Sequence, residues 1–174
     1  MEDHTTTRRA TRRPEGVLTI LATSESPRIR TEVLHFSTTC RNEFWDLSDL
    51  VREVVQRAGV RHGQVTVHTP HTTTSIILNE SETGFLNDYR RMIDGIVPVA
   101  GYYEHDDHAL RTENLQEDEY LNGHAHVRQM LVGGAAATIP VVDGEVLLGT
   151  WQKVLFGEFD QARERRVNIH VQGV

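Results

Sequence analysis

Three histidines stand out in this sequence, because each lies among groups that could help it bind a metal ion or a phosphate. His71 follows Pro70 and precedes a run of hydroxyl side chains, which consists of Thr72, Thr73, Thr74 and Ser75. His105 lies in the acidic segment YYEHDD, and His126 lies in NGHAH. Histidine is the commonest side-chain metal ligand. Three histidines from three separate segments could form a metal site that leaves positions open for water or substrate.

Each of these segments also has an ordinary structural explanation. Threonine favours strands, so the hydroxyl run is compatible with a plain β segment. The acidic residues around His105 are equally compatible with an exposed loop. His124 and His126 are two residues apart and would diverge by about 200° on a helix, so both cannot bind one ion from regular helical positions. His126 lies on the helical side, with Met130 one turn later, and can point inward.

Composition and charge limit the classes of protein to consider. The chain has 174 residues, of which 38% are hydrophobic and 25% charged, as is typical of one globular domain. A net charge of −7 does not favour nucleic acid as a partner. Cys40 is the only cysteine, which excludes an intrachain disulfide and is compatible with a reducing compartment. We find neither a membrane-length apolar run nor a signal-peptide core, and therefore expect a cytoplasmic protein.

The pattern of apolar residues predicts the strands that position these side chains. Residues 1–16 are polar and rich in Thr and Arg, so we expect a mobile tail, in which Arg8 and its neighbours offer only weak support for nucleic-acid contact. Residues 17–174 are expected to form one domain. Alternating or β-branched runs predict strands within the segments 16–24, 30–38, 63–80, 138–151, 151–159 and 166–173. Pro70 interrupts one of them and indicates an edge or a bulge.

Helical spacing of apolar residues predicts three helices. The first lies within residues 44–60, with Asp46 as its N-cap and Gly59 as its C-cap. The second follows Ser81 as N-cap, and its inner stripe is expected to consist of Phe85, Tyr89, Met92 and Ile93. A short third helix covers about 125–132, after a long polar loop that is typical of functional or disordered segments. We therefore expect a single α+β domain with mostly antiparallel or mixed sheets.

Five segments, in their order along the chain, resemble the signatures of the YjbQ-type family, whose members are described as secondary thiamine-phosphate synthases. They are HTTTSIILNE, YEHD, NGHAHVRQMLVG, TIPVVDGEVLLGTWQ and RRVNIHVQG. The resemblance runs from about residue 17 to the C-terminus and departs at Gln161-Ala162, where members often have Gly-Pro. It implies a compact α+β fold, a homotrimer and a divalent metal ion, zinc or magnesium, held by His71, His105 and His126.

The reaction that this resemblance implies joins a pyrimidine-methyl diphosphate to a thiazole phosphate and releases pyrophosphate. The metal ion and arginine side chains would neutralise charge that develops on the diphosphate. Glu80 and Arg166 are the expected catalytic residues. The expected substrate contacts are Thr72, Thr73, Thr74, Ser75, Asn79, Thr150, Trp151 and Gln152.

Some of these residues have structural alternatives, and the site has other possible functions. Trp151 could be a core or subunit-interface anchor instead of a stacking face for a heterocycle. Glu80 could supply negative charge at the start of the following helix. The same residues are compatible with a metal-dependent phosphate-ester hydrolase. They are also compatible with a non-catalytic protein that binds a metal or a phosphorylated metabolite and has incidental synthase activity.

Overall fold

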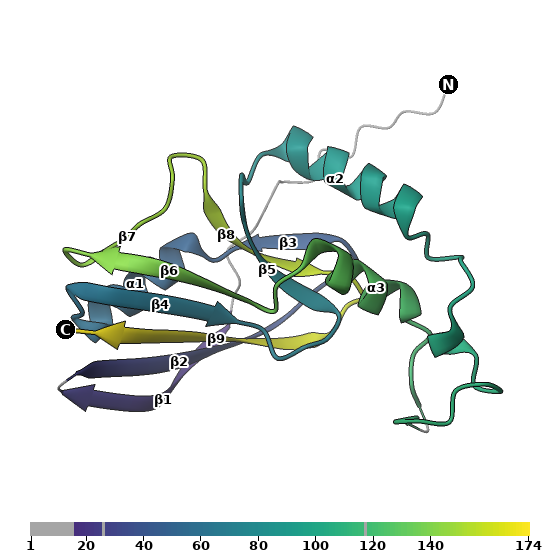
Figure 1. The fold of residues 1–174 in the computed structure, drawn as a ribbon, viewed down its shortest axis with the longest axis horizontal. Coiled ribbons are helices and arrows are strands. Elements are labelled where there is room, and N and C mark those ends of the chain that lie inside the picture. Colours follow the sequence, from purple (N-terminus) through teal and green to yellow (C-terminus); the bar gives the residue numbers. More distant parts are fainter. Residues whose placement is uncertain (1–15, 26, 117) are drawn as a thin grey trace.

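A computed structural model describes residues 16–25, 27–116 and 118–174, which fold into strands of two sheets and three α-helices (Figure 1). The strands are β1 Val17–Glu25, β2 Arg28–Ser37, β3 Glu43–Asp46, β4 His62–His68, β5 Thr74–Asn79, β6 Ala136–Val142, β7 Glu145–Val146, β8 Lys153–Glu158 and β9 Glu164–Gly173. The helices are α1 Ser48–Ala58, α2 Thr83–Ile96 and α3 Gly123–Val132, and a short 3-10 helix, η1, covers Glu104–Asp106. The expected mobile tail lies outside the described residues, apart from Gly16.

The described strands form a six-stranded sheet in the order β1-β2-β9-β4-β6-β7 and a three-stranded sheet in the order β3-β8-β5. Every pairing between them is antiparallel. This architecture confirms the expected α+β class. Within the described ranges, we find no helix whose length and apolar character would let it cross a membrane.

The segment predicted as one interrupted strand, residues 63–80, is divided between the two sheets. β4 belongs to the larger sheet and β5 to the smaller, so Pro70 marks a corner and not a bulge within one strand pair. The hydroxyl groups of Thr69 and Thr74 lie 2.6 Å apart across this corner, and Thr74 also donates to the carbonyl of His71 at 3.3 Å. These local bonds turn the chain from one sheet to the other and leave His71 at the turn.

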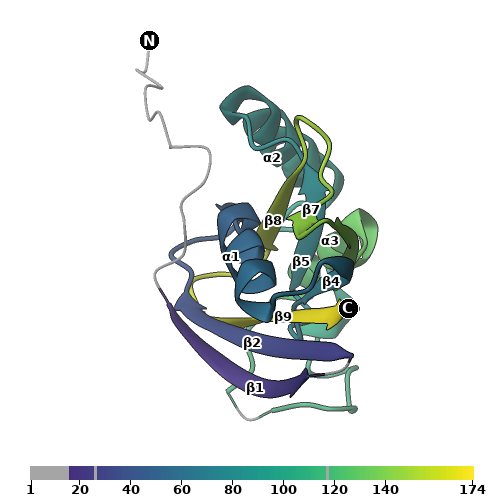
Figure 2. The same ribbon diagram turned by 90° about the vertical axis from the view of Figure 1, so that its left-hand side faces the viewer.

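The main hydrophobic core lies between α1 and strands of both sheets. Leu50, Val51, Val54 and Val55 of α1 are buried at the spacing of one helical face. They pack with apolar side chains from the larger sheet and with Phe156 from the smaller. Figure 2 shows α1 over β2 and beside β8. The two sheets are therefore held together by a shared core, which fixes the junction between them.

The ends of the first two helices depart in part from the predicted caps. Gly59 ends α1 with φ of 63°, as its spacing predicted, but Asp46 lies one residue before the capping position and accepts the N–H of Ser48 at 2.9 Å. At α2 the N-cap is Glu82 and not Ser81, because the Glu82 carboxylate accepts the N–H groups of the next helical residues.

The inner face of α2 also differs from the prediction in one residue. Met92 is 52% exposed and therefore lies outside the inner stripe.

A buried arginine ties α3 to the end of α2. Arg128 of α3 is fully buried and donates to the Val97 carbonyl at 3.0 Å, to Asn42 Oδ1 at 3.0 Å and to the Asp94 carboxylate at 2.8 Å. A buried guanidinium is tolerated when its donors are satisfied in this way. Arg128 therefore fixes the helix that carries His126.

The shared core predicts a large cost for truncating one of its side chains. Leu34 of β2 is 2% exposed, and Leu34→Ala is expected to lower the free energy of unfolding by about 2–5 kcal/mol. Leu110→Ala, at a side chain that is 60% exposed, is expected to change it by less than about 0.5 kcal/mol. Urea unfolding of the two variants would measure this contrast, and similar losses would contradict the assigned core.

Candidate anion-binding site

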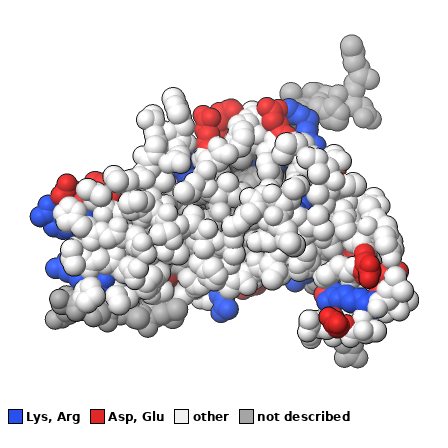
Figure 3. Space-filling model, in the orientation of Figure 1, with Lys and Arg blue, Asp and Glu red and all other residues white. Residues whose placement is uncertain are grey.

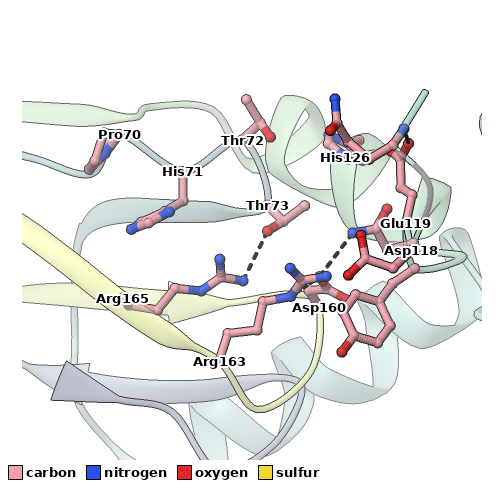
Figure 4. Close-up of a pocket in the computed structure, with 13 residues that line it drawn as sticks. Pro70, His71, Thr72, Thr73, Asp118, Glu119, His126, Asp160, Arg163 and Arg165 are labelled. Carbon is pink, nitrogen blue, oxygen red and sulfur yellow. Dashed lines mark hydrogen bonds and ion pairs between the residues drawn. The ribbon is translucent and has the colours of Figure 1, made fainter. Parts of the chain in front are cut away.

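A pocket of about 440 Å³ opens at the junction of the two sheets (Figure 4). Its walls come from three segments, which are the corner after β4, the loop that leads into α3 together with the start of α3, and the loop between β8 and β9 together with the start of β9. The lining residues are Pro70, His71, Thr72, Thr73, Gln116, Asp118, Glu119, Tyr120, Asn122, His126, Asp160, Arg163 and Arg165. Three segments far apart in the sequence therefore meet here.

A buried ion pair places Arg165 in this pocket. Arg165 is 7% exposed and donates to the Glu158 carboxylate through Nε at 2.6 Å and Nη2 at 2.8 Å. Nη2 also lies 3.1 Å from Thr73 Oγ1. Glu158 is fully buried and accepts further bonds from Thr38 Oγ1 at 3.1 Å and from the N–H of Asp160 at 3.0 Å. Burial raises the pKa of Glu158, and the bond from Arg165 opposes that rise.

A second arginine lies nearer to the solvent. The Arg163 side chain is 30% exposed, its Nε lies 2.8 Å from Asp160 Oδ2, and its guanidinium carbon lies 4.4 Å from the centre of the Tyr120 ring. The Nε–Oδ2 contact is close but not aligned as a hydrogen bond. Asn122 Nδ2 donates to the same Asp160 oxygen at 2.9 Å. Asp160 and Tyr120 thus hold Arg163 at the pocket.

His71 is half-buried beside these cationic groups. Its Nε2 accepts the backbone N–H of Arg166 at 3.0 Å. Burial, together with the positive charges of Arg165, Arg166 and Arg163, lowers the pKa of His71 to about 4. The imidazole is therefore neutral at neutral pH. Since Nε2 is the acceptor, the hydrogen of the neutral ring is on Nδ1.

His105 and His126 lie together, with their ring centres 4.5 Å apart, but only His126 lines the pocket. His105 Nδ1 lies 3.0 Å from Asp106 Oδ1, and the His105 ring contacts Arg111, which donates to Glu119 at 2.8 Å. Basic and acidic side chains alternate at the end of the molecule where this loop projects (Figure 3). Burial lowers the pKa of His126, and His105 lowers it further.

The three expected metal ligands do not assemble within one chain. In the ranges that the structure describes, no group of three His, Cys, Asp or Glu side chains is placed to hold a metal ion. Figure 4 shows His71 and His126 on opposite sides of the pocket. The Nε2 lone pair of His71 is already engaged by Arg166. His71, His105 and His126 therefore do not fit a metal ion in the arrangement that one chain provides.

The predicted hydroxyl run divides at the corner. Thr72 is exposed and Thr73 is buried, and both line the pocket. Thr74 and Ser75 are fully buried and do not line it. Thr74 bonds to Thr69 across the corner, whereas Ser75 Oγ has no hydrogen-bond partner among the described residues. Of the four residues predicted to contact substrate, Thr74 and Ser75 therefore do not reach this pocket, because β5 begins at Thr74 and enters the core.

A second set of predicted residues lies away from this pocket, and none of them lines it: Asn79, Glu80, Thr150, Trp151 and Gln152. In the pairing of β5 with β8, Thr74 lies opposite Glu158 and Asn79 lies opposite Lys153. Five residues along a strand span roughly 16 Å, so the two sets occupy opposite ends of this strand pair. Trp151 is 72% exposed in the turn before β8. One chain thus separates residues that were expected to share a site.

The sequence pointed to Arg166 as a site residue, whereas Arg165 is the neighbouring arginine that lines the pocket. Strand alternation puts Arg165 on the same face as Val167 and Ile169, which are buried, and puts Arg166 on the exposed face. Arg166 contributes its backbone N–H and does not line the pocket. The sequence pattern does indicate Arg165, because a charged residue that alternates with buried apolar residues along a strand must face the interior and find a partner there. Its partner Glu158 is indicated in the same way, because it is an acidic residue that directly follows the apolar residues of β8.

Comparison with known proteins points to one family. The family model for UPF0047 protein YjbQ-like matches residues 32–174, which include every residue of the pocket. A UPF0047 protein of Archaeoglobus fulgidus is 39% identical over 136 residues, which cover 78% of this chain and 96% of the relative. A UPF0047 protein of Methanothermobacter thermautotrophicus is 35% identical over 145 residues, which cover 83% of this chain and 93% of the relative.

Solved structures share the fold. A YbjQ-like protein of unknown function from Sulfolobus solfataricus P2 superposes with a TM-score of 0.73 at 26% identity, covering 84% of this chain and 98% of that one. A protein of the yjbq/upf0047 family from Clostridium acetobutylicum superposes with a TM-score of 0.65 at 31% identity, covering 79% of this chain and 98% of that one. The two-sheet architecture is therefore shared across nearly the whole length of these structures.

The buried pair at the pocket predicts an asymmetric effect on stability. Glu158→Ala leaves the Arg165 guanidinium buried without its counter-ion, and we expect it to lower the free energy of unfolding by about 3–5 kcal/mol. The control is Asp88→Ala, which removes an ion pair whose side chains are 72% and 70% exposed and is expected to cost less than about 1 kcal/mol. Chemical denaturation measures both, and equal effects would count against a structural role for Glu158.

The lowered pKa of His71 predicts a pH-dependent difference between the wild type and His71→Gln. The unfolded chain takes up the His71 proton near pH 6.5, whereas the folded chain takes it up only near pH 4, so this residue lowers wild-type stability as pH falls between those values. Glutamine does not titrate. Urea unfolding from pH 7 to pH 4 should show the variant gaining stability relative to the wild type, and a constant difference would contradict the assignment.

Proposed function

Because this chain belongs to the YjbQ-like UPF0047 family, we propose that its pocket joins a pyrimidine-methyl diphosphate to a thiazole phosphate, forming thiamine phosphate and pyrophosphate. The observation that carries this proposal is the separation of charge across the pocket. Arg165 and Arg163 lie along one side, with Asp160 paired to Arg163, whereas Asp118 and Glu119 lie at the other (Figure 4). A pocket with this polarity suits a reaction in which opposite charges develop at two places.

The proposed reaction develops charge in that way. The thiazole nitrogen uses its lone pair to form a bond to the methylene carbon of the pyrimidine. The bond from that carbon to the diphosphate oxygen breaks, and its electron pair leaves with pyrophosphate. Positive charge thus appears on the thiazolium ring and negative charge on the leaving group. Fixed charges of opposite sign at the two positions stabilise such a transition state without reorganisation.

The side of the pocket formed by Arg163, Arg165 and Thr72, here called the basic wall, is suited to hold the diphosphate. Glu158 fixes the orientation of Arg165, so this guanidinium is already in place before a ligand arrives. Arg163 is partly exposed and can contact a bound oxyanion from the mouth of the pocket. Thr72 adds an exposed hydroxyl donor. Charge-assisted bonds from arginine to phosphate oxygens are the strongest of these contacts.

The acidic end of the pocket is suited to the amino group of the pyrimidine and to the cationic product. The bond from Arg111 lowers the pKa of Glu119, so its carboxylate remains ionised at neutral pH. Asp118 is exposed at the same side. Both residues offer only acceptors when ionised, which matches ligand groups that are donors. No serine or cysteine nucleophile is required, because the thiazole nitrogen is itself the nucleophile.

Product analysis tests this proposal. Purified protein is mixed with the pyrimidine diphosphate and the thiazole phosphate, with magnesium or with a chelator, and thiamine phosphate is measured. Arg163→Gln removes one charged donor and is expected to raise KM for the diphosphate by roughly 10- to 100-fold, the factor for a lost hydrogen bond to a charged group. Arg91→Gln, at an exposed side chain of α2, is expected to leave KM unchanged.

Three outcomes of this assay would count against the transferase. Phosphate or pyrophosphate released without the thiazole phosphate would indicate a hydrolase that uses water at the same pocket. Binding of the diphosphate without any turnover would indicate a binding protein. Equal KM values for Arg163→Gln and Arg91→Gln would exclude the basic wall as the diphosphate site.

A further inference from the structure

We propose that His71 is a neutral hydrogen-bond donor to a bound oxyanion and is not a metal ligand, the role that the family resemblance suggested. The inference rests on the proposed function in one respect, since the oxyanion is taken to be a phosphate or diphosphate group in the same pocket. It depends on three observations. The backbone N–H of Arg166 donates to Nε2 of His71, β4 ends before it could supply a carbonyl acceptor to that N–H, and three arginine side chains place positive charge around the ring.

The bond from Arg166 decides which nitrogen of His71 carries hydrogen. A backbone N–H can only donate, so Nε2 must be the acceptor in the 3.0 Å contact. A neutral imidazole has one acceptor nitrogen and one donor nitrogen. The donor is therefore Nδ1, to which no described group is bonded. A metal ion needs a nitrogen with a free lone pair, and in this arrangement neither nitrogen of His71 offers one.

The fold explains why this ring is positioned to accept from the backbone. β4 pairs with β9 only as far as His68 opposite Asn168, and the chain then leaves the sheet at the corner. Arg166 lies two residues before Asn168 in β9, beyond the end of this pairing, where β4 no longer provides a carbonyl acceptor. The His71 ring takes the place of the missing strand and satisfies that N–H. The tautomer of His71 is thus set by the backbone and does not depend on a mobile side chain.

The charges that act on the ring favour an anion over a cation. They come chiefly from the guanidinium groups of Arg165, Arg166 and Arg163. Of these, Arg165 is paired with Glu158 and Arg163 lies against Asp160. Arg166 is exposed on the outer face of β9. A divalent cation at His71 would meet three positive groups, whereas an oxyanion would be attracted to them and could accept from Nδ1.

Two substitutions separate the donor role from a purely structural one. Asparagine places its amide nitrogen near the position of Nδ1, and glutamine places its amide oxygen near the position of Nε2. His71→Asn should retain the affinity for inorganic pyrophosphate within about threefold, measured by calorimetry in the presence of a chelator. His71→Gln should keep the bond to Arg166 but lose affinity by roughly tenfold or more, because the donor is gone.

The wild-type protein provides a direct readout that needs no variant. Long-range ¹H–¹⁵N spectra should show hydrogen on Nδ1 and none on Nε2 of His71, and the signals should not shift when one equivalent of zinc is added. Added pyrophosphate should shift the Nδ1 signal. Zinc binding by His71→Asn, measured by elemental analysis after dialysis, should equal that of the wild type.

Opposite results would overturn the assignment. These are hydrogen on Nε2, a His71 signal that titrates with zinc, zinc binding lost in His71→Asn, or pyrophosphate affinity kept by His71→Gln and lost by His71→Asn. None of these measurements requires the thiazole phosphate or turnover. Failure to form thiamine phosphate would therefore refute the proposed reaction and leave the role of His71 to be decided by its own data.

Discussion

The pocket depends on the buried ion pair between Glu158 and Arg165. The pair joins the end of β8 to the start of β9, and through Thr73 and Thr38 it also reaches the corner after β4 and the end of β2. A buried pair of this kind contributes little net stability, because the cost of removing both charges from water offsets their attraction. Its value here is positional, since it holds a guanidinium in a pocket that is otherwise open to solvent.

The rest of the site follows from the junction of two sheets around one core. The corner at Pro70 exists because β4 and β5 belong to different sheets, and the loop after β8 exists because β8 and β9 do as well. Both turns occur at the same junction, which brings His71 and Thr72 next to Arg163 and Arg165. The third wall comes with α3, whose position is set by the bonds of the buried Arg128.

His71 illustrates how backbone geometry decides the chemistry of a side chain. The same residue could ligate a metal, accept a proton or donate a hydrogen bond, and all three roles are compatible with its position in the sequence. The roles are separated by a single contact, because the Arg166 N–H occupies the lone pair that a metal would need. Five ordered motifs identify the family, but they carry no information on such a contact.

Much of the fold and part of the site could be read from the sequence. Local periodicity determined the three helices, the Gly59 cap and most strands, because these depend on residues close in the chain. Motifs placed His71, Thr72, Thr73 and His126 at one pocket. Only the tertiary structure decided that Thr74 and Ser75 enter the core, that Arg165 and not Arg166 lines the pocket, and that Trp151 lies beyond the end of β8 away from it. Those outcomes depend on which strands become neighbours, and pairing between distant segments is set by the whole core.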